Sequence, residues 1–470
     1  MRMHVWMLCL VFCASCASDE RTCQKAPPNF VVVLVDDQAW NGTSVEMVPG
    51  MPESASDFHQ TPWLDSLAQG GMRFSNARAS APVCAPSRYS IQFGKSPARI
   101  QLIRVGMNTS HIPHGDWVSL PKALRAIDST YLAAHFGKWG MGGTPEEVGY
   151  DVSDGSTKNV DGGFVNDRSQ WETEVVSDPK RVFELTDRAM GFIDSCHALS
   201  RPFFLQLSHY AVHTNIETTQ ASFEEVRATE SGQRHRHQGM AGMTMDLDAS
   251  LGQLLTKVDE LGLDDNTYVI YLSDNGGVPN IPGAKKYEKS LNEPLSRGKW
   301  DAMEGGLRVP FLVSGPGVPA NVATSAHVWG ADLLPTVAEL AGGWSEEPDS
   351  LDGGSFAHVL QGVHSTDVVR PNGGMAFHVP YQNRIALNRA HSAWISGHYK
   401  LLKFHDNGEV RLFDLEKDLE ETTNLALKLP ELAHDMESDL LDYLKQVKAP
   451  RWQEGITWKK DPFRSFESTH

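Results

Sequence analysis

The sequence predicts an α/β protein with a large, mostly parallel sheet sandwiched by helices and a smaller C-terminal α+β subdomain. Three runs of apolar, largely β-branched residues have the pattern of strands buried on both faces, at residues 29–35, 202–208 and 268–273. Helical stretches alternate with runs of this kind, at residues 120–127, 182–193 and 240–261. This alternation is typical of a parallel sheet covered by its crossover helices.

The pattern changes after residue 365. Short strand patterns follow at residues 392–395, 398–403 and 409–414, and Asp406, Asn407 and Gly408 between the last two form a hairpin signal. A helix is predicted over residues 430–448. We therefore expect two domains, residues 24–365 and residues 366–470, the second with an antiparallel sheet.

Polar residues follow each of the three predicted strands. Asp36 and Asp37 come after the first, His209 and His213 after the second, and Asp274 and Asn275 after the third. In open α/β sheets ligands bind at the carboxyl ends of the strands, so these groups are expected to meet in one cleft. Carboxylates gathered there repel one another unless a cation binds, and hard oxygen ligands suit Ca²⁺ better than Mg²⁺.

A short segment from Cys84 to Arg88, reading Cys-Ala-Pro-Ser-Arg, leads into a predicted helix that stops at Gly94. Pro86 suits the first turn, where a missing N–H costs nothing. Cys84 is therefore expected near a helix N-terminus, where free N–H groups favour anions. Taken alone, the same string also fits a buried structural cysteine before a capped helix.

Four segments together resemble the type I, formylglycine-dependent sulfatases of the alkaline-phosphatase-like superfamily, in the polysaccharide sulfatase branch. Residues 84–88 resemble the C-x-P-S-R signature and residues 136–142 the G-K-W-H-L-G segment, with Gly140 in place of the histidine. Residues 211–214 resemble A-P-H-T-P, and residues 296–310 resemble R-G-G-K-x-x-x-x-E-G-G-x-R-V-P. The resemblance covers roughly residues 28 to 430.

The resemblance implies that Cys84 is oxidised to formylglycine by a formylglycine-generating enzyme, and that its aldehyde hydrate attacks sulfur. It implies one Ca²⁺ ion held by Asp36, Asp37, Asp274, Asn275 and the residue derived from Cys84. Arg88 would steady the hydrate, and Lys138, His213 and Lys299 would bind sulfate. For protonating the leaving oxygen we expect His213 first and Lys299 second. His378, Arg384 and Arg389 of the C-terminal subdomain are expected substrate contacts.

The implied activity is hydrolysis of sulfate esters on a carbohydrate, with marine algal polysaccharides preferred over animal glycosaminoglycans. A phosphonate or phosphodiester hydrolase of the same superfamily is one alternative. The missing histidine at Gly140 suggests another, an inactive protein that binds sulfated glycans. If the enzyme is active, either another residue such as His209 or His111 substitutes, or the leaving group is held differently.

The overall charge is acidic, with 42 Lys and Arg residues against 59 Asp and Glu residues, or −17. This balance argues against non-specific nucleic-acid binding. It also means that a polyanionic substrate needs a locally basic cleft.

Residues 1–18 have the pattern of a signal peptide, with Arg2 and His4 before an apolar run that is too short to span a membrane. Alternatively, residues 1–15 form a bacterial lipoprotein signal with Cys16 as the lipid-anchored residue. Either reading predicts export to the periplasm or the cell surface. In that oxidising compartment Cys23 and Cys196 either form a disulfide or stay as free buried thiols.

Overall fold

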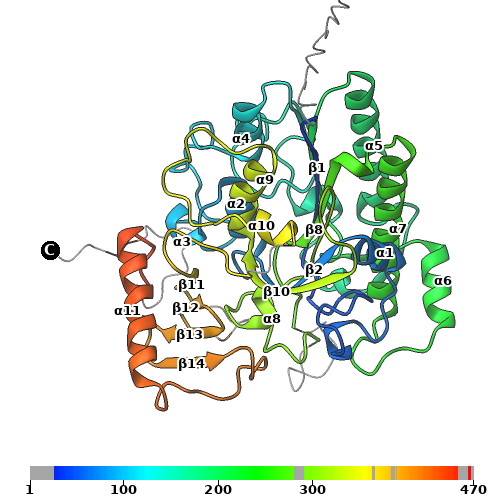
Figure 1. Cartoon of the computed structure of the whole chain (residues 1–470). Coiled ribbons are helices and arrows are strands. Elements are labelled where there is room, and N and C mark those ends of the chain that lie inside the picture. The colour runs from blue at the N-terminus through cyan, green and yellow to red at the C-terminus, as the bar shows by residue number, and fades with distance from the viewer. Residues whose placement is uncertain are drawn as a thin grey trace, which may run out of the picture.

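The computed structural model describes residues 26–279, 291–362, 366–382, 387, 389–453 and 464–466. Its centre is an eight-stranded sheet in the order β10-β2-β9-β8-β1-β6-β3-β4 (Figure 1). Neighbouring strands are parallel except where β9 pairs with β2 and β8. The strands are β1 (Asn29–Val35), β2 (Met72–Arg78), β3 (Leu132–Gly137), β4 (Val152–Ser153), β6 (Phe203–Ser208), β8 (Thr267–Ser273), β9 (Phe311–Ser314) and β10 (Val322–Trp329).

Helices cover both faces of this sheet (Figure 1). Apolar residues of α2, α4 and α9 pack with Val32 and Leu34 of β1, and those of α1, α5 and α7 pack with Val33 and Val35 on the opposite face. Because successive residues of a strand point to opposite faces, a strand covered on both sides must be apolar throughout. The helices are α1 (Pro62–Gly70), α2 (Cys84–Phe93), α3 (Pro97–Ile100), α4 (Leu120–Ile127), α5 (Val182–Ala198), α6 (Gln220–Ala228), α7 (Gln238–Glu260), α8 (Glu304–Leu307), α9 (Leu333–Leu340), α10 (Ala357–Leu360) and α11 (Pro430–Gln446).

The predicted fold class is confirmed, and the predicted strands and helices lie within a few residues of the observed ones. Strands β2, β3, β4, β9 and β10 of the main sheet were not predicted. Strand β3 shows why, since it consists largely of small residues and contains the polar His135. That imidazole is fully buried and its Nε2 lies 3.1 Å from Ser208 Oγ, so the strand is internal without an apolar run.

A second, antiparallel sheet follows in the order β11-β12-β13-β14, as predicted for the C-terminal subdomain. Helix α11 packs against one face through Leu440 and Leu444, and the other face packs on the main domain at Met303 and Trp329. The strands are β11 (Met375–Val379), β12 (His391–Ser396), β13 (Tyr399–Phe404) and β14 (Val410–Asp414), and a separate parallel pair is formed by β5 (Thr173–Val175) and β7 (Ile216–Thr218).

A buried group of charges joins the two sheets. The carboxylate of Glu304 accepts hydrogen bonds from Arg78 of β2 at 2.7 Å, Arg308 at 2.5 Å and Lys400 of β13 at 3.1 Å. Lys400 also lies 2.7 Å from Glu421. These side chains are almost fully buried, so each charge needs its partners. The ion pairs therefore fix the position of the second sheet relative to the main sheet.

Residues 1–25 carry the predicted signal, Cys16 and Cys23, and lie outside the described residues. Cys196 is buried on α5, so its pairing with Cys23 stays a prediction. Within the described ranges, no helix has the length and apolar character needed to cross a bilayer.

Asp248 on α7 predicts a pH-dependent stability. Its carboxylate accepts hydrogen bonds from the backbone N–H groups of Trp63 and Leu64 at the start of α1, both at 2.9 Å. Burial raises its pKa to about 7, so the folded state binds one proton more than the unfolded state between about pH 4 and pH 7. The stabilisation from that proton is lost as the pH rises through this window, at no more than about 1.4 kcal/mol per pH unit.

We therefore expect the free energy of unfolding of the wild type to fall between pH 5 and pH 7 relative to that of Asp248→Asn. Urea unfolding at several pH values measures both. Asp259→Asn on the exposed face of α7 is the matched control for the loss of one carboxyl group. Parallel pH profiles for the wild type and Asp248→Asn would contradict this assignment.

Candidate active site

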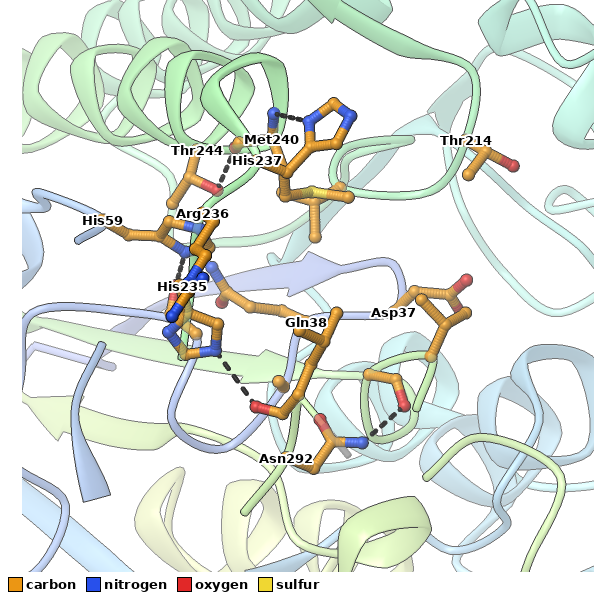
Figure 2. A pocket seen from close by; sticks show the side chains of 16 residues that line it. Asp37, Gln38, His59, Thr214, His235, Arg236, His237, Met240, Thr244 and Asn292 are labelled. Carbon is orange, nitrogen blue, oxygen red and sulfur yellow. Dashed lines mark hydrogen bonds between the residues drawn. The ribbon is translucent and has the colours of Figure 1, made fainter. Parts of the chain in front are cut away.

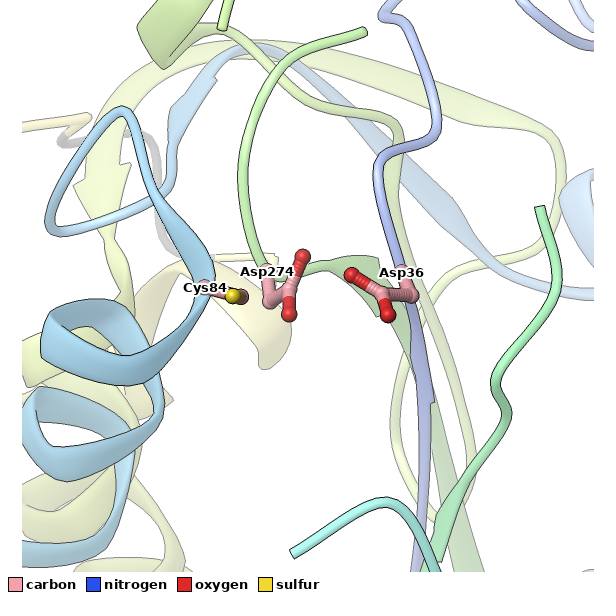
Figure 3. A group of neighbouring side chains, drawn as sticks. All are labelled: Asp36, Cys84 and Asp274. Atoms are coloured by element: carbon pink, nitrogen blue, oxygen red, sulfur yellow. The ribbon is translucent and has the colours of Figure 1, made fainter. Parts of the chain in front are cut away.

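The carboxyl ends of neighbouring strands bring the predicted polar residues together. Asp36 and Asp37 directly follow β1, and Asp274 and Asn275 directly follow its neighbour β8. Cys84 is the first residue of α2. Figure 3 shows the carboxylates of Asp36 and Asp274 and the Cys84 side chain facing one another, and ligand atoms of the three lie within 4.8 Å of each other.

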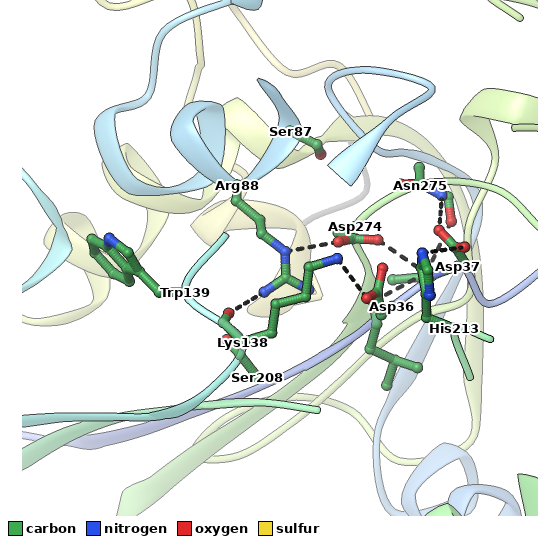
Figure 4. A network of polar contacts seen from close by, with 12 residues as sticks. Asp36, Asp37, Ser87, Arg88, Lys138, Trp139, Ser208, His213, Asp274 and Asn275 are labelled. Atoms are coloured by element: carbon green, nitrogen blue, oxygen red, sulfur yellow. Dashed lines mark hydrogen bonds and ion pairs between the residues drawn. The ribbon is translucent and has the colours of Figure 1, made fainter. Parts of the chain in front are cut away.

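Three buried ion pairs surround this point, all of them between residues that the sequence singled out, and Figure 4 shows those of Lys138 and Arg88. Lys138 Nζ lies 2.5 Å from Asp36 Oδ2, and Arg88 Nε lies 2.8 Å from Asp274 Oδ2. Lys299 Nζ lies 2.6 Å from Asp37. Three carboxylates thus meet three cations, and each of these side chains is at most 7% exposed.

Burial and neighbouring charges shift the acidities within the cluster. Burial disfavours ionisation of Asp36, but Lys138 and its neighbours overcome this and hold the Asp36 pKa well below its ordinary value. At Asp274, burial and the charge of Asp36 raise the pKa to about 6 despite Arg88. Burial also raises the pKa of the Cys84 thiol. As an unmodified thiol, Cys84 is therefore a weak nucleophile at neutral pH.

The cluster has the donors that a calcium ion needs. Asp36 Oδ1 and Asn275 Oδ1 are buried, and neither has a hydrogen-bond partner among the described residues. Asn275 Nδ2 donates to Asp37 Oδ1 at 2.8 Å, which fixes the orientation of the amide. Buried oxygens without partners cost about 1–3 kcal/mol each. Two such oxygens beside Asp37 and Asp274 fit a hard divalent cation.

His213 lies beside the same carboxylates. Its Nδ1 is 2.7 Å from the carbonyl oxygen of Thr214, so Nδ1 carries the proton and Nε2 is the acceptor. Nε2 is 3.3 Å from Asn159 Nδ2, which donates to it, and 3.7 Å from Asp37 Oδ2. Burial lowers the pKa of His213 to about 4.

Two of the expected substrate contacts do not reach the cluster. His378 is buried in the second sheet, where Nδ1 lies 2.6 Å from Ser392 Oγ and Nε2 lies 2.6 Å from the Pro450 carbonyl oxygen. Both ring nitrogens are occupied, contrary to the prediction that His378 contacts substrate. Arg389 forms ion pairs with Asp406 and Glu409. Arg384 lies outside the described residues.

Gly140 lacks space for the histidine of the resembled segment. Its φ is +68°, a left-handed conformation that strains any residue with a Cβ. A Cβ there would lie 3.1 Å from Arg88 Cδ and 3.4 Å from Lys138 Cε. The two expected substitutes stay predictions. His209 is buried and neither of its ring nitrogens has a partner among the described residues, and His111 Nε2 lies 3.2 Å from the Ile100 carbonyl oxygen.

A cavity of about 420 Å³, which we call the Cys84 cavity, opens beside this cluster. Its described lining residues are Cys84, Ala85, Tyr89, Leu102, Arg104, Val105, Gly106, Met107, Thr109, Lys138, Gly140, Met141, Gly142, Lys158, Asn159, Val160 and Phe164. Arg104 and Lys158 were not predicted as cavity residues, because they lie in irregular segments where no periodicity indicates which way a side chain points.

A smaller cavity of about 70 Å³ lies next to Asp37 (Figure 2). Its wall contains His59, His235 and His237, and the rings of the first two stack with centroids 4.9 Å apart. His235 Nδ1 lies 2.9 Å from Ser56 Oγ and its Nε2 lies 3.1 Å from the Leu291 carbonyl oxygen. Both of its ring nitrogens are thus in use, so this histidine group is not a metal site of three free imidazoles.

The sheet order, the second antiparallel sheet and the carboxylate cluster at the carboxyl edge agree with the expectation of a hydrolase of the alkaline-phosphatase-like superfamily. The sulfatase family model matches residues 28–343, and the model of the N-sulphoglucosamine sulphohydrolase C-terminal region matches residues 299–449. The chain therefore belongs to the sulfatase family, and it is a sulfuric ester hydrolase.

Individual relatives agree with this assignment. A sulfatase of Formosa agariphila is 26% identical, over 90% of this chain and 90% of that protein. The N-acetylgalactosamine-6-sulfatase of Canis lupus familiaris is 27% identical, over 77% of this chain and 71% of that protein. The solved structure of Ps i-CgsB has a TM-score of 0.71 and 25% identity, covering 89% of this chain and 92% of that chain. A second structure of Ps i-CgsB holds k-i-k-neocarrahexaose.

Proposed function

We propose that this chain hydrolyses sulfate esters on a carbohydrate, using a formylglycine formed from Cys84 and one calcium ion. The observation that carries the proposal is the convergence of Asp36, Asp274 and Cys84 on one point at the N-terminus of α2. The raised pKa of the Cys84 thiol argues against the unmodified thiolate as the nucleophile, since an unmodified thiol there is mostly protonated. The two unpartnered oxygens of Asp36 and Asn275 support the calcium ion.

Asp36, Asp37, Asp274 and Asn275 would hold the ion, together with the residue derived from Cys84. When both groups are present, the aldehyde hydrate supplies the nucleophilic oxygen and the ion neutralises charge on the sulfuryl oxygens. Arg88 fixes the positions of Asp274 and of the Lys138 backbone, because its Nε donates to Asp274 and its Nη1 donates to the Lys138 carbonyl oxygen at 2.5 Å.

Lys138 and Lys299 bring fixed positive charge to the point where the sulfuryl group must lie. Such preorganised charges stabilise a transition state more strongly in a buried site than in water. The alkoxide of a sugar is a poor leaving group, so a proton donor is required. We assign this role to His213 first and to Lys299 second. Because His213 is neutral in the free site, with Nε2 as an acceptor, Nε2 must take up a proton when the sulfate binds before it can donate one. Both contact Asp37, which places them on the same side of the cluster.

A sulfated polysaccharide of marine algae, or its oligosaccharides, is the preferred substrate. The likeness to Ps i-CgsB, of which one structure is a complex with k-i-k-neocarrahexaose, and to N-acetylgalactosamine-6-sulfatase supports a carbohydrate substrate. Export to the periplasm or the cell surface, with or without a lipid anchor at Cys16, fits a substrate met outside the cell.

The test is sulfate release by the mature protein from a panel of desalted sulfated polysaccharides and their oligosaccharides. The mass of the peptide that contains residue 84 first shows whether the aldehyde is present. Phosphate monoesters, phosphodiesters and phosphonates are assayed in parallel. We expect sulfate release from at least one algal polymer at a kcat/KM well above that for any phosphorus ester. Faster phosphoryl hydrolysis, or calcium-dependent glycan binding without sulfate release, would contradict the proposal.

A further inference from the structure

Trp300 has a backbone conformation that a bulky residue rarely adopts. Its φ is +78°, in the left-handed region where any residue with a Cβ is strained. Gly298, the glycine of the same segment, lies outside that region. Strain of this kind persists only where the surrounding structure holds it, and it is concentrated at functional sites. The chain therefore carries an indole at a position that glycine would occupy without strain.

Two hydrogen bonds fix the backbone at this position. The Trp300 N–H donates to the carbonyl oxygen of Pro82, which precedes Cys84 by two residues, at 2.8 Å. The N–H of Lys299 donates to the Gly277 carbonyl oxygen at 2.9 Å, in the segment that follows β8. Trp300 is thus held beside two of the segments that supply the active-site cluster.

Packing in the apolar core does not explain the indole. Trp300 is half-buried, and within the described ranges it belongs to none of the apolar clusters that fill the two domains. The tryptophans that do fill these clusters are at most 1% exposed, namely Trp40, Trp139, Trp329 and Trp394. The side chain of Trp300 therefore has a different role.

The indole lies close to the point where the sulfuryl group must bind. Lys299 Nζ is 5.3 Å from the centre of the Trp300 ring, a cation–π distance, and 2.6 Å from Asp37. This ammonium group is one of the two that we expect to contact the sulfuryl oxygens. The ester oxygen joins the sulfuryl group directly to the sugar, so the sugar ring is the next part of the substrate. A bound glycan sulfate therefore brings a sugar ring close to the indole.

An aromatic ring suits such a neighbour. The face of the ring is electron-rich and the C–H groups of a sugar are weakly positive, so the two attract each other when they pack together. We propose that Trp300 is a specificity-determining residue whose indole packs against the sugar ring that bears the scissile sulfate, so that glycan sulfates are preferred over the sulfate esters of small alcohols. This inference rests on the proposed function and names a part of the substrate that the site binds besides the sulfate.

Binding to a chain that cannot turn over its substrate tests the proposal. Calorimetry on the full-length mature chain carrying Cys84→Ala, with calcium present, measures the affinity for tetrasaccharides of kappa-carrageenan, iota-carrageenan and chondroitin 4-sulfate. Inorganic sulfate competes in the same titrations, which gives the affinity of the cluster for the anion alone. Adding Trp300→Gly removes the indole and the backbone strain together, so the fold is expected to remain. We expect this change to weaken binding of the tightest tetrasaccharide roughly tenfold and to leave the affinity for inorganic sulfate unchanged.

Two further variants sharpen the result. Trp300→Phe keeps an aromatic ring and is expected to retain most of the tetrasaccharide affinity. Trp63→Ala is the matched control, because Trp63 is 42% exposed on α1 and packs on Gly252 of α7. It is expected to keep both affinities.

Unchanged tetrasaccharide binding by Trp300→Gly would overturn the proposal, and so would the absence of tetrasaccharide binding to the Cys84→Ala chain. An equal loss of affinity for inorganic sulfate would also overturn it, because the indole would then only support Lys299. Sulfate release by the enzyme with Cys84 intact is scored separately. If no sulfate is released but Trp300→Gly still weakens tetrasaccharide binding selectively, the proposed reaction fails and the sugar contact stands.

Discussion

Replacing Cys84 by alanine is expected to lower sulfate release by a factor on the order of 10⁴ or more. The side chain supplies the only atom that the proposed reaction can convert into its nucleophile, and it faces the carboxylates of Asp36 and Asp274. Alanine fits the same helical position, so the fold is expected to remain. Initial rates of sulfate release and circular dichroism of the same preparations measure the two effects.

Cys196→Ala is the matched control, because Cys196 is also a buried cysteine but packs among apolar side chains on α5. This variant is expected to retain the wild-type rate. Substantial sulfate release by Cys84→Ala, or an equal loss in Cys196→Ala, would remove the assignment of Cys84 as the source of the nucleophile.

The second large effect is expected at Asp36. Asp36→Asn removes one of the proposed calcium ligands and leaves the Lys138 ammonium group buried without its carboxylate. We expect activity to fall on the order of 10²- to 10³-fold or more. We also expect the thermal stabilisation by calcium to disappear. For the wild type, calcium at a hundred times its dissociation constant should add about 2.7 kcal/mol to the free energy of unfolding.

Thermal unfolding with added calcium and with a chelator measures this difference independently of turnover. Asp352→Asn serves as the control, since Asp352 is a buried carboxylate paired with Arg99 at 2.7 Å and lies outside the cluster. It is expected to lower stability while keeping the calcium-dependent shift. A calcium-dependent shift that persists unchanged in Asp36→Asn would show that this carboxylate does not hold the ion.

Residues at the carboxyl edge of the sheet could be placed from the sequence for a physical reason. A strand covered on both faces must be apolar throughout, so β1 and β8 are visible as runs that end sharply at Asp36 and Asp274. Parallel neighbours finish at the same edge, which brings these residues together although more than 230 positions separate them. The resemblance then added Lys138 and Lys299, which neither composition nor periodicity marks.

The wrong and the missing predictions concern side chains whose orientation depends on a partner strand or on the path of a loop. His378 lies on β11 opposite Ser392 of β12, and this register turns the imidazole toward Ser392 and Pro450 and away from the cluster. Its sequence neighbours do not encode that pairing. Arg104 and Lys158 reach the Cys84 cavity from irregular segments, where no repeat links position to direction.

The charge group around Glu304 makes the catalytic half and the C-terminal half of this chain a single cooperative unit. Glu304 begins α8 only five residues after Lys299, and its carboxylate binds Lys400 of the second sheet. The Glu304 backbone N–H also donates to Glu421 at 2.8 Å. Separation of the second sheet from the main sheet would leave the buried charges of Glu304 and Lys400 without sufficient partners. It would also remove support from the segment that contains Lys299. The C-terminal subdomain of another protein is therefore not expected to fit this catalytic domain unchanged. A substitution at Lys400 or Glu421 would require a compensating substitution at Arg78, Glu304 or Arg308.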